Sequence, residues 1–452
     1  MKSAVALLLF LFMFAFSAGV VLADDVRPVE NLSSLVETAL TNNPELKSSQ
    51  ARWEMFVAKA KQAGALEDPM LMFKLQNMIV REPFVFDKDP QSAKVIGISQ
   101  QLPFWGKRAI RQEAADYEAG SYKWAAEERK LELSRMVKET WYQIWALDKS
   151  LEIIDRNVKI LSDFVAIAET KYSVGQGVQQ DIYKAGLEKS KMLDMQITLR
   201  QQRRSLEANL NYLLYRPGNT PVGTIPDFTL PHIPLSAEQL NNAAGEKRPQ
   251  IKSLIMLANK GEASRRLAQK EFWPDFNLSL EYMIREPSMD EPGDDMFTLG
   301  VTFNLPLQQE RRRSMLVEST SEESMATAEL NSLKNTISFT INDTLAQLER
   351  RRKLVELYQG GIIPQAEQSL ESAVIGYRVN KVDFLALLDS RMNLFSYERE
   401  LYESQAEYMI QLARLEAAVG VDPVSVSPSF TGQNTEYRTD PAAAASTHSQ
   451  HH

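Results

Sequence analysis

The sequence predicts a mainly α-helical fold that also carries four short transmembrane β-strands. Three observations support this prediction: the chain contains an internal repeat, each repeat contains two segments of alternating polarity, and each repeat ends in long stretches without proline. Hydrophobic residues make up 44% of the 452 residues and charged residues 24%, which is typical of a folded chain. The chain is therefore too apolar to be disordered along its whole length.

The first 23 residues read as an export signal. Lys2 supplies a positive charge, Ala4 to Phe16 form an apolar segment, and Val21-Leu22-Ala23 fits a cleavage site. An uncleaved anchor is the alternative, because the apolar run extends to Ala23. Beyond this segment no apolar run approaches the roughly 18 residues that a membrane helix needs. We therefore expect an exported chain whose helices do not cross a membrane.

The body of the chain reads as a tandem duplication. Pro44-Glu45-Leu46-Lys47-Ser48 resembles Pro249-Gln250-Ile251-Lys252-Ser253, and Tyr172-Ser173-Val174-Gly175 resembles Tyr377-Arg378-Val379-Asn380. The order and the nearly constant spacing of these matches predict two equivalent units. The predicted organisation is an export signal at 1–23, a first repeat at 24–215, a proline-rich linker at 216–245, a second repeat at 246–421 and a flexible tail at 422–452.

The linker and the tail have distinct compositions. The linker has prolines at positions 217, 221, 226, 231 and 234, so it can form neither a helix nor a central strand. The tail is rich in Ser, Pro, Thr and Ala, which is typical of a disordered segment. It ends in His448, His451 and His452, and this leaves metal binding by the tail as an open alternative.

Each repeat opens with a helix and continues with two strands. The strands are predicted at about 70–80 and 93–102 in the first repeat, and at about 275–285 and 296–305 in the second. In the last of them, Phe297, Leu299 and Val301 alternate with Thr298, Gly300 and Thr302. A period of two residues gives a strand one apolar and one polar face. About ten residues is the length that a tilted transmembrane strand needs.

Two long helices complete each repeat. They are predicted at about 107–174 and 178–215 in the first repeat, and at about 309–379 and 382–419 in the second. Along the first helix, apolar residues recur at intervals of three and four, which is typical of a coiled-coil seam. Gly360-Gly361 and Pro364 interrupt the third helix, as a kink or as a side excursion.

The predicted strands require more than one copy of the chain. Four amphipathic strands are too few to close a barrel, and open sheet edges do not persist in lipid. Three copies of four strands would give 12 strands, an even number within the range of such barrels. We therefore expect a homotrimer with a 12-stranded barrel around a water-filled interior, continued by a coiled-coil helical cylinder. The alternative is a non-channel periplasmic coiled-coil scaffold or adaptor that carries two β-hairpins.

The order of these elements resembles the TolC family of trimeric outer-membrane efflux channels. The segment from Gln100 to Arg108 resembles the strand-to-helix junction of the heavy-metal and multidrug branch of that family. Tyr172-Ser173-Val174-Gly175 and Tyr377-Arg378-Val379 resemble its two helical-tip signatures. The resemblance covers Leu35 to Val421. It implies the outer membrane of a Gram-negative bacterium, with a long periplasmic extension, as the location.

The resemblance also implies partners. The chain would be the exit duct of a tripartite efflux system, in contact with outer-membrane lipid, with a periplasmic adaptor (a membrane fusion protein) and with an inner-membrane pump of the RND type. The turns at Val174-Gly175-Gln176 and Val379-Asn380-Lys381 would dock the adaptor. Each turn needs a residue that tolerates a positive φ, and Gly175 and Asn380 suit this. Both turns are also consistent with simple helix C-caps.

A periplasmic gate is implied at three residues. Tyr377 would donate a charge-assisted hydrogen bond to Asp181 and hold the tip closed. Three copies of Asp389 would ring the pore constriction and attract cations. The family often carries a second acid at the position of Ala386, and its absence implies a single acidic ring; Asp383 is a substitute if the turn is shifted by one residue. Tyr377 as helix-seam filler and Asp389 as a solvated surface acid are the alternatives.

The composition excludes several other functions. The chain has no cysteine, so lipidation of an N-terminal cysteine, thiolate metal sites and cysteine nucleophiles are absent. A net charge of −8 argues against nucleic acid as a partner. We find no phosphate-binding glycine loop and no histidine dyad, so we expect no catalytic residue, no cofactor, no metal site and no enzymatic activity.

The sequence leaves the transported substrate open. The 17 methionines would suit soft metal ions such as Cu(I), but those flanking the strands serve equally well as hydrophobic filler. The junction segment favours heavy-metal cations, and drugs come next. Protein export through a type I secretion system is the remaining alternative.

Overall fold

The computed structural model describes residues 31–288 and 291–424. The predicted export signal at 1–23 and the predicted tail from 425 onward, with its three histidines, lie outside the described residues. Among the residues that are described, no helix is both long enough and apolar enough to span a membrane.

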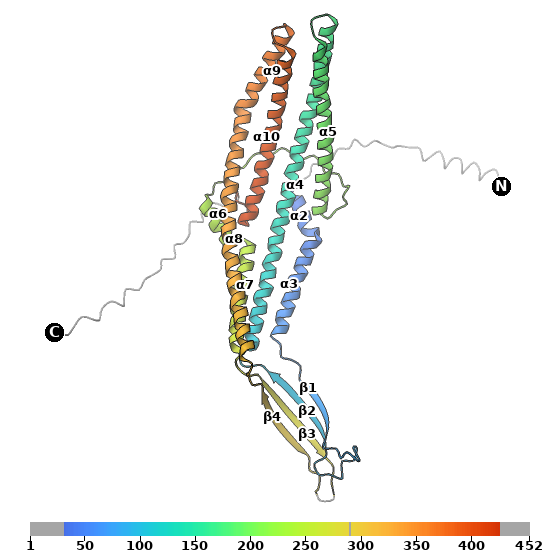
Figure 1. The fold of residues 1–452 in the computed structure, drawn as a ribbon, viewed down its shortest axis with the longest axis vertical. Helices are drawn as coiled ribbons and strands as arrows, with labels where there is room; N and C mark the ends of the chain where they lie inside the picture. Colours follow the sequence, from blue (N-terminus) through green and yellow to red (C-terminus); the bar gives the residue numbers. More distant parts are fainter. Residues whose placement is uncertain (1–30, 289–290, 425–452) are drawn as a thin grey trace, which may run out of the picture. The chain divides into compact units, whose positions relative to one another are not determined.

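Long helices and four short strands make up the part of the chain that the structure describes, which confirms the mainly helical prediction (Figure 1). The helical elements are α2 (Leu32–Asn42), α3 (Pro44–Ala63), α4 (Lys107–Ser173), α5 (Gln179–Leu213), α6 (Ala237–Lys247), α7 (Pro249–Lys270), α8 (Gln309–Leu357), the π-helical turn η1 (Tyr358–Ile362), α9 (Ile363–Arg378) and α10 (Phe384–Val419). The strands are β1 (Met70–Gln76), β2 (Ala93–Leu102), β3 (Phe276–Arg285) and β4 (Met296–Phe303).

Three elements differ from the sequence prediction. Helix α6 begins inside the predicted linker, where Ser236 and Gln239 form a capping box. Helix α2 was not predicted; it begins after Asn31, whose side chain accepts from the N–H of Ser33. Strand β1 ends at Gln76, because Asn77 adopts a φ of 53° and turns the chain out of the sheet.

The predicted side excursion in the third long helix is absent. A π-helical turn joins α8 directly to α9, with the N–H of Ile363 donating to the carbonyl of Tyr358. Pro364 lacks the N–H that an α-helix would require at this point. The wider π-turn accommodates this missing donor, and Gly360-Gly361 lies within it.

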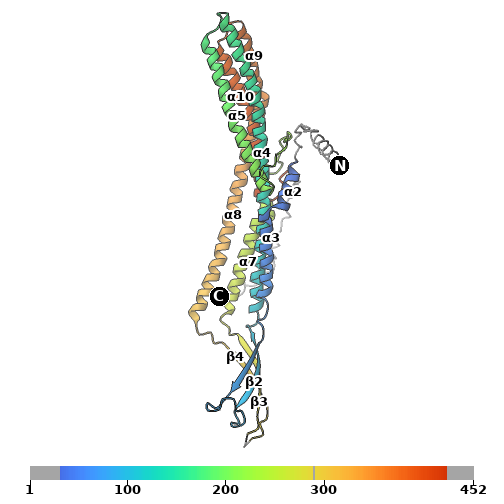
Figure 2. The same ribbon diagram turned by 90° about the vertical axis from the view of Figure 1, so that its right-hand side faces the viewer.

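The strands form one antiparallel sheet in the order β1-β2-β3-β4 (Figure 1), and Figure 2 shows the sheet turned by 90°. The pairing of β2 with β3 joins the hairpins of the two sequence repeats. The register places Leu71, Ile98, Leu280 and Leu299 in one row, and Met72, Gly97, Glu281 and Thr298 in the next. Because adjacent residues of a strand face opposite sides, the sheet has one apolar and one largely polar face, as predicted.

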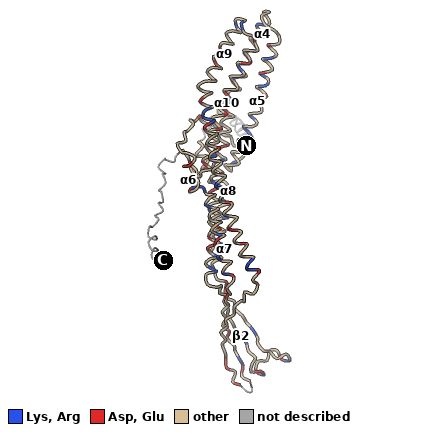
Figure 3. Tube along the Cα trace, turned by 60° about the vertical axis from the view of Figure 1, so that its left-hand side comes forward, with Lys and Arg blue, Asp and Glu red and all other residues tan. Residues whose placement is uncertain are grey.

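Charge is distributed unevenly between helices and strands. Acidic and basic residues are interspersed along the helices, whereas the sheet is nearly free of them (Figure 3). Within the four strands only Lys74, Lys94, Glu281 and Arg285 are charged. Lys74 and Glu281 form an ion pair of 3.2 Å on the polar face, so the apolar face carries little charge.

The chain divides into two compact units. The first contains residues 31–50, 129–230 and 348–413 of the described chain, and the second contains 51–128, most of 231–347, and 414–424. Both units therefore combine segments from the two sequence repeats. In the first unit, α4, α5, α9 and α10 pack around one apolar cluster, which we call the tip bundle; it includes Ile154, Leu161, Phe164, Phe384 and Phe395.

Candidate functional site at the helical turns

Two turns of the tip bundle have the same backbone geometry. After α4, the N–H of Gln176 donates to the carbonyl of Lys171 over 2.9 Å, and after α9 the N–H of Lys381 donates to that of Gly376 over 2.8 Å. Gly175 and Asn380 have φ values of 72° and 58°, as the sequence predicted. This pattern is a Schellman C-cap in both cases. The predicted docking role of the two turns stays a prediction.

At two equivalent positions, the two turns have a large and a small residue in opposite order. Lys171 and Gly177 in the first turn correspond to Gly376 and Val382 in the second, by the spacing of the repeat. A Cβ atom on Gly376 would lie only 2.5 Å from Cγ2 of Val382, and one on Gly177 would lie 3.1 Å from Cβ of Lys171. Each turn thus needs glycine on one side of the same contact.

Lys171 joins the two turns. Its Nζ donates to the carbonyl of Tyr377 and to Oδ1 of Asn380, each over 2.6 Å. The same ammonium lies 4.2 Å from the centre of the Tyr377 ring. Sequence reasoning missed this residue. Its place in the last turn of α4 could have drawn attention to it, because a cation there interacts favourably with the negative end of the helix dipole.

No hydrogen bond joins Tyr377 and Asp181, although the charge of Asp181 acts on the phenol. Tyr377 is 6% exposed, and its Oη has no hydrogen-bond partner. Burial raises the pKa of the Tyr377 phenol, and the negative charge of Asp181 adds to this. Burial also raises the pKa of Asp181; Asp383 reinforces this, while Lys184 and Lys171 oppose it. The structure does not contain the predicted bond, and the gate role of the two residues stays a prediction.

The two remaining acids have different surroundings. Oδ1 of Asp383 accepts from the N–H of Ala386 over 2.7 Å and so caps the start of α10. Asp389 is exposed, and its Oδ2 accepts from Nδ2 of Asn393 over 3.0 Å. Capping accounts for Asp383, so of these two acids Asp389 is the one that remains available to solvent.

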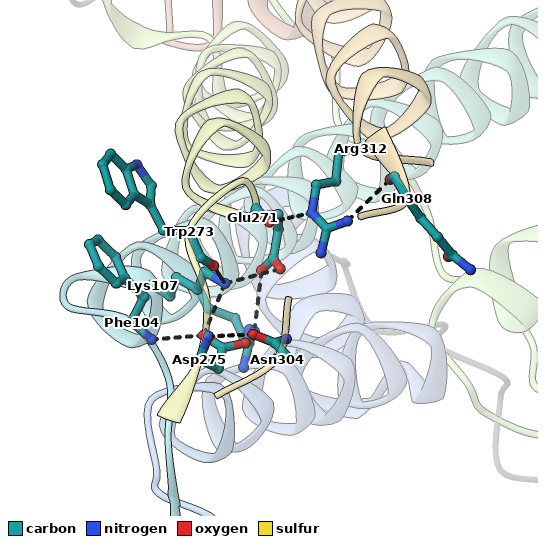
Figure 4. A network of polar contacts seen from close by, with 9 residues as sticks. Phe104, Lys107, Glu271, Trp273, Asp275, Asn304, Gln308 and Arg312 are labelled. Atoms are coloured by element: carbon teal, nitrogen blue, oxygen red, sulfur yellow. Dashed lines mark hydrogen bonds and ion pairs between the residues drawn. The ribbon is translucent and has the colours of Figure 1, made fainter. Parts of the chain in front are cut away.

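A second polar site lies at the strand-to-helix junction (Figure 4). Lys107 begins α4 and is 1% exposed. Its Nζ lies 3.2 Å from Oε2 of Glu271, 2.9 Å from Oδ1 of Asp275 and 3.0 Å from the carbonyl of Trp273. Nε of Arg312, near the start of α8, donates to the carbonyl of Glu271 over 2.6 Å. Glu271 is thus contacted by one cation from the start of α4 and by another from the first turn of α8.

The junction network also fixes the backbone of the segment that the sequence singled out. The N–H of Phe104 donates to Oδ1 of Asp275 over 2.8 Å, and the rings of Phe104 and Trp273 stack at 5.2 Å. The N–H of Asp275 donates to Oδ1 of Asn304 over 2.7 Å. Among the described residues, no group of three or more His, Asp or Glu side chains is placed to hold a metal ion.

A family model and several known proteins are similar to this chain. A family model described as "Outer membrane efflux protein" matches residues 35–214 and 240–421. Outer membrane efflux protein BepC of Brucella suis is 21% identical over 419 residues, which cover 89% of this chain and 88% of that protein. Cobalt-zinc-cadmium resistance protein CzcC of Cupriavidus metallidurans is 29% identical over 150 residues, 32% of this chain and 34% of that one.

A solved structure has the same fold. The outer membrane protein VceC from Vibrio cholerae matches with a TM-score of 0.73 and 19% identity, over 86% of this chain and 96% of that chain. At this identity the likeness concerns the fold alone. The family match covers both sequence repeats and leaves out most of the stretch between them.

Proposed function

This chain belongs to the outer membrane efflux protein family, and from that premise we propose that three copies form one continuous duct through the outer membrane and the periplasm. Like the other members of its family, the chain is an outer-membrane efflux channel and not an enzyme. The proposal concerns the trimer, its gate, its partners and its substrate, in the setting of a Gram-negative cell envelope.

The two-faced sheet carries the proposal of a trimeric barrel. Its apolar face is exposed in the single chain, with Phe73 at 72% and Phe297 at 76%. Among the described residues, β1 and β4 each pair with a strand on one side only. Pairing β4 of one copy with β1 of the next is antiparallel and would close 12 strands around the polar face. Lipid would then contact the apolar face and water the polar face.

Engineered disulfides test this closure directly, because the chain has no native cysteine. Thr298→Cys in β4 is combined with Met70→Cys, Met72→Cys or Lys74→Cys in β1, all on the polar face. At least one pair is expected to give covalent trimers after oxidation. Matched controls combine Thr298→Cys with Leu71→Cys or Phe73→Cys, which point to the opposite face and should not link. Monomers in every pairing would contradict the trimeric barrel.

We further propose that Asp181, Tyr377 and Asp389 form the periplasmic gate. The buried, unpartnered Oη of Tyr377 supports this, and so does the influence of the Asp181 charge on the phenol. The exposure of Asp389 supports its place in an acidic ring around the threefold axis. Contact with the partner proteins would break the Tyr377–Asp181 link and bias the bundle toward an open state.

The turns between the tip helices are the proposed docking surface for a periplasmic adaptor of a tripartite system with an inner-membrane pump. Val174 and Val379, at equivalent positions of the two turns, are 63% and 57% exposed. Val174→Asp with Val379→Asp should abolish co-purification of the adaptor while leaving the trimer intact. Retained co-purification would remove the turns from the docking surface.

Heavy-metal cations are the proposed substrate class, ahead of drugs. The similarity to a cobalt-zinc-cadmium resistance protein supports metals, although it spans only part of both chains. A deletion strain should become sensitive to cobalt, zinc, cadmium or copper, and recover with the intact gene. Sensitivity to a drug panel alone would favour organic substrates instead.

A further inference from the structure

The tip bundle contains a buried cation without a paired acid. Arg391 of α10 is 4% exposed, and its Nε donates to Oδ1 of Asn157 over 2.7 Å. Asn157, on α4, is itself 1% exposed. The Nη2 atom of Arg391 is buried and has no hydrogen-bond partner. Burial lowers the pKa of this guanidinium, which Glu398 opposes and Arg156 reinforces.

Asn157 belongs to a run of three polar residues on α4 that contact two other helices. Asp155 accepts a hydrogen bond from Gln196 of α5. Arg156 forms an ion pair of 2.7 Å with Glu398 of α10, and Asn157 binds Arg391 on the same helix. Consecutive helical residues are about 100° apart, so the run faces α5 on one side and α10 on the other. Glu398 and Arg391 lie about two turns apart on α10, so α4 contacts α10 at two levels.

A buried, unpaired guanidinium is energetically unfavourable. Replacing buried charged residues by apolar ones of similar volume is often neutral or stabilising. A single buried polar contact has a different benefit, because it selects one register where an apolar seam would tolerate several. On α10, Arg391 lies between Leu388 and Phe395 of the apolar cluster, and apolar side chains alone specify the register of a helix weakly.

The helix geometry connects this contact to Asp389. Residues two apart in an α-helix point about 200° away from each other. Burying Arg391 against Asn157 therefore turns Asp389 toward the opposite, exposed side of α10. We propose that Arg391 is a positioning residue that fixes the rotation of α10 and so presents Asp389 to the pore. The relevance of this presentation to conduction rests on the proposed function.

Thiol reactivity in the detergent-solubilised trimer tests the proposal. Asp389→Cys and Leu388→Cys introduce single thiols, about 100° apart, into a chain without cysteine. In the otherwise native chain, the thiol at 389 should react fast with a charged reagent and the thiol at 388 slowly, because Leu388 is buried. Adding Arg391→Met should reduce the ratio of the two rates roughly tenfold, because each thiol reacts in proportion to the population that exposes it.

A merely structural role would give a different result. Arg391→Met would then lower the unfolding temperature and leave the ratio of rates unchanged, and this outcome would overturn the proposal. Arg399→Met is the matched control: it removes the same charge from α10, but Arg399 is paired with an acid, Glu403 at 2.7 Å, and its side chain is 27% exposed. This control should not change the ratio. Arg391→Lys, which keeps a donor for Asn157, should restore part of it.

The proposed function can fail separately. Cation selectivity in planar bilayers should fall in Arg391→Met as it does in Asp389→Asn. If Asp389→Asn leaves selectivity unchanged, the gate assignment fails while the thiol ratio still decides the role of Arg391. If Asp389→Asn lowers selectivity and Arg391→Met changes neither selectivity nor the ratio, the positioning role alone is wrong.

Discussion

The strand-to-helix junction and the tip bundle each contain a buried cation, and the two cations are held in opposite ways. At the junction, Lys107 contacts two carboxylates and a carbonyl within 3.2 Å. In the tip bundle, Arg391 has one amide partner and one buried nitrogen without any. Buried charges are stable when paired and hydrogen-bonded, and costly otherwise. The junction is thus built as a fixed anchor.

The tip bundle, by contrast, leaves several polar groups unsatisfied. Oη of Tyr377, Nη2 of Arg391 and Oε2 of Glu398 are all buried without a hydrogen-bond partner. Such groups favour any rearrangement or partner that satisfies them. This difference between the two cation sites fits a channel whose strand-to-helix junction stays fixed while its tip helices change state. The following changes test the comparison, from the largest expected effect to the smallest.

Lys107→Met should be the most damaging change. It leaves Glu271 and Asp275 without their shared cation, and breaking a buried pair in this way costs about 3 kcal/mol. Denaturant unfolding in detergent measures the loss. A triple variant, Lys107→Met with Glu271→Gln and Asp275→Asn, should recover most of it, because no uncompensated charge remains. A loss of less than about 1 kcal/mol in the single variant would mean that the network is not an anchor.

Asn157→Asp should make the tip bundle resemble the junction. A carboxylate at this position would face Nε of Arg391, and a hydrogen bond between charged groups adds about 1.5 kcal/mol. The unfolding free energy should rise, and the thiol of Leu388→Cys should react more slowly. Asn157→Ala is the control that removes the acceptor, and it should lower stability. Equal stability of the two variants would contradict the view that Arg391 lacks an anionic partner.

Tyr377→Phe should cost almost nothing in the structure described. Its hydroxyl makes no hydrogen bond, so the unfolding free energy should change by less than about 0.5 kcal/mol or should increase. The free energy of unfolding is measured for the monomer and the trimer in parallel. A loss of about 1 kcal/mol that occurs only in the trimer would place the Tyr377–Asp181 bond in the assembled, closed state.

Asp181→Asn should have the smallest effect, and one that depends on pH. Burial raises the pKa of Asp181 in the folded chain, so folding favours its protonated form. The resulting stability is present below the unfolded pKa and is lost as pH rises through the folded pKa. Asparagine should therefore be slightly more stable at pH 7, and the difference should vanish near pH 4. A difference that grows toward low pH would contradict this.

The sequence could predict those features that depend on local pattern. Alternating residues such as Phe297, Leu299 and Val301 located β4 and its two faces. The repeat placed Gly175 and Asn380 at equivalent turns, and both have positive φ. The capping box at Ser236 could have revealed α6, but the surrounding prolines favoured a linker.

Features that depend on which helices meet could not be predicted. Lys107, Lys171 and Arg391 look like ordinary charged residues of long helices, and their roles arise from partners more than 150 positions away. The pairing of Tyr377 with Asp181 was implied by family resemblance, and Oη of Tyr377 has no hydrogen-bond partner in the single chain. The sequence allowed Asp383 as a substitute for Asp389, but the carboxylate of Asp383 caps α10.

Conductance in planar bilayers tests the central claim most directly. The detergent-purified trimer should show discrete, cation-selective openings. Asp389→Asn should reduce the selectivity, and Tyr377→Phe should increase the conductance. A chain that is extracted without detergent, remains monomeric and produces no openings would contradict the channel and support a periplasmic scaffold instead.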